Sequence, residues 1–313
     1  MSVAPKKNPA ASTPAATLAV APLAQTNAAY TKALEKLQDI PTLPVVAMRV
    51  NELINDPTSS SADIAEVLKK DQVLTAKVLR LVNSGYYSIP GGVTDVQRAL
   101  AFLGFNTLAQ VVLGISVFTA FSKIQPEDLS MTDFWRHALG TAVCAEIIAR
   151  RLKYPRPEEA FTCGLLHDIG KLVMQVVDPE RLSDIVRKAK ASSKSFTEIE
   201  RERDLPGHSF LGEMIATRWG LPQLIRLAIR YHHQDVAPLA SVLASAKPVI
   251  QMVRLANVLC IKNQIGKSGD CSAGEITPDM LRPLQLTDAD IAEVEAKLKL
   301  DIDKAGALFS AYR

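Results

Sequence analysis

Apolar residues recur at helical spacing along most of this 313-residue chain, and this periodicity restricts the fold more than any other feature. After Asp71, for example, the apolar residues Leu74, Val78 and Val82 fall on one face of a helix. No stretch shows the sustained alternation of a half-buried strand, and no repeat of 20–50 residues is present. The pattern therefore predicts an all-α fold.

Turn residues and helix caps divide the chain into successive helices. The boundaries predict helices over residues 45–54, 61–68, 71–82, 96–103, 108–121, 131–152, 158–177, 210–219, 222–231 and 248–261, and a last one after Thr287. Residues 1–28 are rich in Ala and Pro and interrupted by prolines, which predicts a disordered tail without a signal peptide.

Composition argues against several classes of partner. The net charge is only +3 and aromatic residues are 5% of the chain, so neither nucleic acid nor an anionic membrane surface is expected. The longest apolar run, Leu108–Phe121, is shorter than the ~20 residues of a membrane span. The four cysteines form no C-x-x-C pair, which favours free thiols in the cytoplasm.

The chemistry-bearing residues are the five histidines, all of which lie between residues 137 and 233. They are His137, His167, His208 and the adjacent pair His232 and His233, and His167 is followed directly by Asp168. Imidazole nitrogen together with a carboxylate suits Fe, Mn, Zn or Ni. Any one of these histidines taken alone is more simply a hydrogen-bonded core or surface residue, so the metal hypothesis depends on the set.

The set resembles the HD superfamily of metal-dependent phosphohydrolases, whose pattern is H…HD…H…HH…D, and within it the HDOD (HD-related output domain) family. The stretch from Asp71 to Tyr87 resembles the amino-terminal HDOD signature, and His167–Lys171 and Trp219–Pro222 also match. The resemblance covers roughly residues 30–262. It implies an HD-superfamily fold in which an N-terminal helical lobe (29–125) packs on an HD lobe (126–262), followed by a helical extension (263–313).

The resemblance also implies roles for individual residues. One ion would be bound by His137 and His167, Asp168 would bridge two ions, and a second ion would be bound by His208, His232 and His233. Asp133, one turn before His137, is a weaker candidate ligand, and its other interpretation is a helix-start carboxylate. Lys171 stands where related hydrolases place a phosphate-contacting lysine, so it joins Asp168 as a candidate catalytic residue. The cofactor would be one or two divalent ions, iron first, otherwise Mn, Zn or Ni.

Two departures from the hydrolase pattern bear on activity. The final aspartate of the pattern aligns with Asn257, a neutral and weaker ligand, and no Gly-Tyr-Pro loop follows His233. The resemblance therefore implies a cytoplasmic bacterial signalling module that contacts signalling proteins and hydrolyses little. The alternative is an active phosphohydrolase for a nucleotide or cyclic dinucleotide. The apolar face of the last helix, with Ile291, Val294 and Leu298, would either dock on the core or mediate oligomers.

Overall fold

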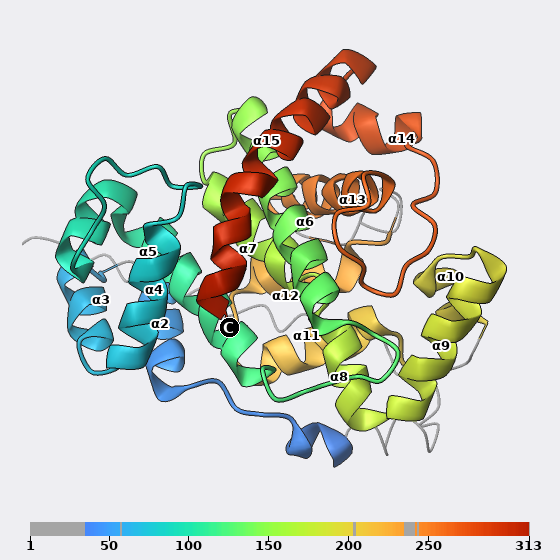
Figure 1. Ribbon diagram of the computed structural model, residues 1–313, viewed down its shortest axis with the longest axis horizontal. Helices are drawn as coiled ribbons and strands as arrows, with labels where there is room; N and C mark the ends of the chain where they lie inside the picture. The colour runs from blue at the N-terminus through green and yellow to red at the C-terminus, as the bar shows by residue number, and fades with distance from the viewer. Residues whose placement is uncertain (1–34, 57, 203–204, 235–241, 243, 313) are drawn as a thin grey trace, which may run out of the picture.

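The computed structural model is built of helices joined by loops, with no strand among the residues it describes (Figure 1). It describes residues 35–312 except 57, 203–204, 235–241 and 243. The prediction of an all-α fold is confirmed. The predicted disordered tail at residues 1–28 lies outside the described residues.

The N-terminal lobe forms one side of the molecule, on the left in Figure 1. The lobe contains the helices α2 (Val45–Asn55), α3 (Ser61–Leu68), α4 (Gln72–Val82) and α5 (Val96–Ala120). The 3₁₀ turn η1 (Leu37–Asp39) precedes them, lies at the bottom of Figure 1 and packs against α8 (Ile169–Val177). Asp71 caps α4 by accepting a hydrogen bond from the Leu74 N–H at 2.9 Å. Gly104, inside α5, has a φ of 77°, so two helical segments meet there. This agrees with the separate helices predicted on either side of Gly104.

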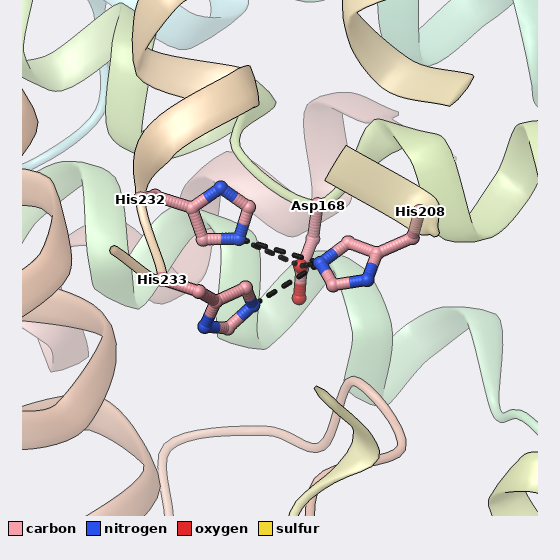
Figure 2. A group of neighbouring side chains, drawn as sticks. All are labelled: Asp168, His208, His232 and His233. Carbon is pink, nitrogen blue, oxygen red and sulfur yellow. Dashed lines mark hydrogen bonds and ion pairs between the residues drawn. The ribbon is translucent and has the colours of Figure 1, made fainter. Parts of the chain in front are cut away.

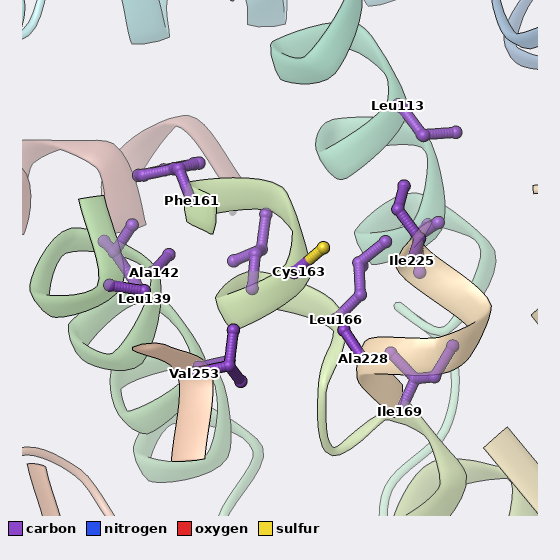
Figure 3. Packing of buried hydrophobic residues seen from close by; sticks show 14 of the residues in the cluster. Leu113, Leu139, Ala142, Phe161, Cys163, Leu166, Ile169, Ile225, Ala228 and Val253 are labelled. Atoms are coloured by element: carbon purple, nitrogen blue, oxygen red, sulfur yellow. The ribbon is translucent and has the colours of Figure 1, made fainter. Parts of the chain in front are cut away.

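The second lobe carries all five histidines. It consists of α6 (Met131–Arg151), α7 (Pro157–Leu166), α8 (Ile169–Val177), α9 (Pro179–Ser192), α10 (Phe196–Arg201), α11 (His208–Arg218), α12 (Gln223–Tyr231) and α13 (Lys247–Lys262). Helix α7 packs against α5, α6, α12 and α13. Figure 3 shows Leu166 of α7 among buried side chains from these neighbours, including Leu113, Ala142 and Ile225. The α7–α8 segment therefore lies in the hydrophobic core.

The single helix predicted over residues 158–177 is wrong. The chain leaves the helix at Leu166, turns through His167 and Asp168, and begins α8 at Ile169. Apolar residues continue at helical spacing on both sides, so the periodicity did not reveal the turn. The turn places the His-Asp pair at the centre of the second lobe, where both side chains are buried.

The C-terminal extension docks on the core. It contains α14 (Pro278–Leu281), the 3₁₀ turn η3 (Arg282–Leu284) and α15 (Asp288–Tyr312), which packs on α6, α4 and α5. The apolar face of α15 is buried by this contact, since Ile291, Val294 and Leu298 are at most 6% exposed. Thr287 caps the helix through its reciprocal hydrogen bonds with Asp290. Helix α15 therefore joins the two lobes (Figure 1).

Two stretches, Val96–Ala120 and Pro157–Val177, are long and apolar enough to cross a membrane by length and composition alone. Their most apolar windows are 61% and 89% buried inside the protein. Such burial is typical of core helices, which can be as long and as apolar as membrane-spanning ones.

Candidate metal centre

The five histidines converge on Asp168 although they come from four separate parts of the chain. His137 lies in the second turn of α6, His208 is the first residue of α11, and His232 and His233 follow the end of α12. Two ligand groups result, and Asp168 belongs to both of them. We call Asp168, His208, His232 and His233 the outer group, and His137, His167 and Asp168 the inner group.

The outer group is spaced as the ligands of a single ion would be (Figure 2). The Nε2 atom of His208 lies 3.1 Å from that of His233 and 3.5 Å from that of His232. Asp168 Oδ1 lies 3.4 Å from His208 Nε2 and 3.5 Å from His232 Nε2. Tetrahedral ligands about 2.0–2.1 Å from an ion are separated by about 3.3 Å, so these four separations match those around a divalent transition metal.

The inner group is a less complete ligand set. Asp168 Oδ2 lies 3.3 Å from His167 Nε2, on the side of the carboxylate away from the outer group. His137 Nε2 lies 2.9 Å from Asn257 Oδ1 on α13. Asn257, which stands where the HD pattern has its final aspartate, therefore reaches the centre. The inner group thus offers two imidazoles and one shared carboxylate, and the neutral amide of Asn257 lies next to it.

Hydrogen bonds to the second ring nitrogen fix the orientation of three histidines. The Nδ1 atoms of His167 and His232 lie 2.7 and 2.8 Å from the carbonyl oxygens of Gly164 and Ile229. His208 Nδ1 lies 2.9 Å from the carboxylate of Glu200 on α10, which also accepts the His208 backbone N–H. These contacts leave Nε2 as the nitrogen that faces Asp168, which is the usual arrangement around metal ions.

The protonation states suit metal binding at neutral pH. Burial lowers the pKa of His137 and of His232 to about 4, so both imidazoles are neutral at pH 7. Burial alone would raise the pKa of Asp168, but Lys171 and His167 outweigh it and hold that pKa well below its usual range. His137 and His232 therefore present neutral imidazoles next to the Asp168 carboxylate.

Lys171 is fully buried beneath the centre. Its ammonium lies 2.8 Å from Asp168 Oδ2, 2.7 Å from Asp270 Oδ2 and 3.2 Å from Ser268 Oγ. An ammonium group has three N–H donors, and these three acceptors use all of them. In this arrangement Lys171 has no donor left for a substrate phosphate, the contact that the resemblance implies.

A glycine allows the close helix contact on which the centre depends. A Cβ atom on Gly170 would lie 1.8 Å from the carbonyl oxygen of His208, so only glycine lets α8 approach the start of α11. This contact holds His208 close to Asp168.

Asp133 lies outside both ligand groups. It occupies the first turn of α6, where its N–H donates to Ser130 Oγ and its carbonyl oxygen accepts the N–H of Lys267. These contacts fit the helix-start interpretation.

Comparison with known proteins places the chain in a family. The family model described as HDOD domain matches residues 40–235, more than half of the chain. The chain belongs to the HDOD family. A crystal structure of an HDOD domain protein with unknown function from Geobacter sulfurreducens is 25% identical, with a TM-score of 0.72, over 91% of this chain and 98% of the other.

Two further crystal structures share the fold of this HDOD chain, each at 24% identity. A "putative signal transduction protein" from Marinobacter aquaeolei VT8 has a TM-score of 0.69 over 89% of this chain and 60% of its own. A "putative phosphohydrolase" from Shewanella amazonensis SB2B has a TM-score of 0.61 over 90% and 93%. An uncharacterised protein of Treponema pallidum (strain Nichols) is 26% identical over 70% of this chain, which spans 44% of that relative's length.

Sequence reasoning about this HDOD chain missed two carboxylates next to the centre. Glu200 precedes the His208 that it orients by eight residues, in a short polar helix that has no distinguishing pattern. Asp270 follows α13 and lies outside both the matched range and the motifs of the resemblance. Each is found only from its contacts in the folded chain.

Proposed function

We propose that this HDOD chain is a bacterial signal-transduction output module that binds a divalent metal ion and hydrolyses phosphate esters little or not at all. The observation that carries the proposal is the outer group, in which His208 Nε2 lies 3.1–3.5 Å from the ligand atoms of Asp168, His232 and His233. Iron is the first candidate, followed by Mn, Zn and Ni, since imidazole and carboxylate ligands suit all of them.

Weak hydrolysis is supported by two features of the centre. A bound ion would supply Lewis-acid stabilisation of charge on phosphate oxygens. The chain's own part in that chemistry is reduced, because Asn257 brings no negative charge and the donors of Lys171 are used within the protein.

The partners that we propose are signalling proteins in the bacterial cytoplasm. The N-terminal lobe contains no histidine, and four of the five large exposed apolar side chains among the described residues lie on it: Val45, Met48, Val73 and Phe102. Exposed apolar side chains indicate a protein-binding surface where they form a contiguous patch, so we propose this lobe as the place where a partner binds. The name of the Marinobacter structure points to the same class of function.

The second candidate is an active phosphohydrolase for a nucleotide or cyclic dinucleotide. It is favoured by Asp168, whose two oxygens face different ligand groups, as a bridging carboxylate in a two-ion hydrolase would.

Metal analysis and an activity panel separate these functions. Protein purified without chelator should contain a transition metal, and His208→Ala with His232→Ala should abolish it. The metal-loaded protein, tested with Mn and Fe on nucleotides and cyclic dinucleotides, should turn over no faster than Asp168→Ala. Efficient turnover would establish the hydrolase instead, and protein without affinity for any of the four metals would refute both candidates.

A further inference from the structure

The buried ammonium of Lys171 lies between two carboxylates, and one of them is the central ligand of the candidate metal centre. Lys171 Nζ is 2.8 Å from Asp168 Oδ2 and 2.7 Å from Asp270 Oδ2, and all three side chains are almost fully buried. A third contact, at 3.2 Å, is to Ser268 Oγ. A fixed positive charge is thus built into the centre.

The loop that supplies Ser268 and Asp270 is held firmly in place. Gly266 has a φ of +64° and packs so closely on α6 that a Cβ atom would lie 2.2 Å from the backbone nitrogen of His137. The Lys267 N–H donates to the Asp133 carbonyl oxygen at 3.0 Å. The second oxygen of Asp270 accepts the Phe196 N–H at 2.9 Å. Contacts with α6 and with the start of α10 therefore fix the position of Asp270.

The lysine charge acts unequally on the two ligand groups. It contacts Asp168 Oδ2, the oxygen that faces His167 and the inner group. The outer group uses the other oxygen, Oδ1, together with three histidines. An ion in the inner position would share its only carboxylate oxygen with an ammonium, and the neighbouring amide of Asn257 adds no compensating charge.

We propose that Lys171, held by Asp270 and Ser268, takes the electrostatic place of a second ion, so that the centre binds one ion, in the outer position. Asp270 is then a positioning residue, because it acts on the centre through Lys171. The inference rests on the proposed metal binding and specifies its stoichiometry and site.

Metal titration of the full chain tests the stoichiometry. Chelator-treated protein titrated with Mn²⁺, Zn²⁺ or Co²⁺ in a calorimeter should bind one ion per chain. His233→Ala should weaken this binding on the order of 100-fold. His137→Ala should still bind one ion per chain, because all four ligands of the outer group remain, and the visible spectrum of its Co²⁺ form should match that of the wild-type chain.

Removing the built-in charge should open the inner position. Lys171→Met combined with Asp270→Asn removes one charge of each sign, and the double variant should bind a second ion. The matched control, Lys194→Met with Glu202→Gln, neutralises an exposed ion pair and should keep one ion.

The outcomes separate this inference from the function on which it rests. A wild-type chain that binds no ion refutes the proposed metal binding itself. Two ions in the wild-type chain, or loss of the single ion in His137→Ala, overturns the one-ion assignment while metal binding stands. A folded Lys171→Met, Asp270→Asn chain that still binds only one ion refutes the role of Lys171. The two single-histidine variants decide the site even where that double variant does not fold.

Discussion

Glu200 acts on the centre without being one of its ligands, because it contacts the ligand His208. Its carboxylate contacts both the backbone N–H and the Nδ1 atom of His208. Burial alone would raise the pKa of Glu200, but His208 outweighs burial and the pKa is lowered, so the group is a carboxylate at neutral pH. Glu200 therefore fixes the orientation of the His208 ring, whose Nε2 atom lies close to the Nε2 atoms of both His232 and His233.

We expect Glu200→Gln to lower metal affinity about 10- to 100-fold, because loss of a charged partner to a ligating histidine has this effect at metal sites. Competition with a coloured chelator measures the change. Glu202→Gln, a neighbouring exposed carboxylate, is the control and should bind the ion as the wild-type chain does. Equal affinity of Glu200→Gln and the control would show that Glu200 does not orient the ligand.

At the same scale, the site residues that belong to a sequence motif could be predicted, whereas those that reach the centre only through the fold could not. His137, His167, Asp168 and the pair after α12 follow a motif, and the structure brings them together. Glu200 and Asp270 belong to no motif, because their roles depend on where a short helix and a late loop come to rest. The buried charge of Lys171 could not be interpreted from the sequence either, because its second carboxylate partner is Asp270.

At the scale of elements, the helices could be predicted more completely than the turn that matters most. Helical periodicity is produced by burial of one face, and α4, α12 and α15 follow it closely. The α7–α8 segment is buried nearly all around, so its apolar residues carry little information about where the helix is interrupted. The turn at His167 and Asp168 therefore remained hidden in a continuous apolar pattern.

Helix α15 offers a test of how much its docking stabilises the fold. Leu298 is fully buried, whereas Leu300 on the same helix is 66% exposed. We expect Leu298→Ala to lower the free energy of unfolding by about 2–5 kcal/mol, because it removes buried methyl groups and leaves a cavity. Leu300→Ala should change it by at most ~0.5 kcal/mol. Urea denaturation measures both, and similar values for the two variants would contradict the docking described above.

For the molecule as a whole, the histidine centre makes the stability of the metal-free protein depend on pH. His137 and His232 have a pKa of about 4 in the folded chain against 6.5 for an ordinary histidine. Between these values the unfolded chain binds more protons than the folded chain. Stability is therefore lost as pH falls from about 6.5 towards 4.

We expect the metal-free protein to lose about 1.4 kcal/mol per pH unit for each of these two histidines across that window. Urea denaturation at pH 7, 6 and 5 in the presence of a chelator measures the slope. Burial also lowers the pKa of His233, so three histidines contribute to the slope, and His232→Asn should reduce it by about a third, whatever it does to the stability at pH 7. A slope that is unchanged in this variant would assign the pH dependence to other groups.

The loop between α13 and α14 has a consequence for where this domain can be said to end. The family match stops at residue 235, yet from beyond that limit Asn257 contacts His137 and Asp270 pairs with Lys171 and holds it in place. A chain cut at the family boundary would keep all five histidines and Asp168 but would leave Lys171 without one of its two carboxylates. Changes in this late segment can therefore alter the charge at the centre of the molecule while every ligand stays the same.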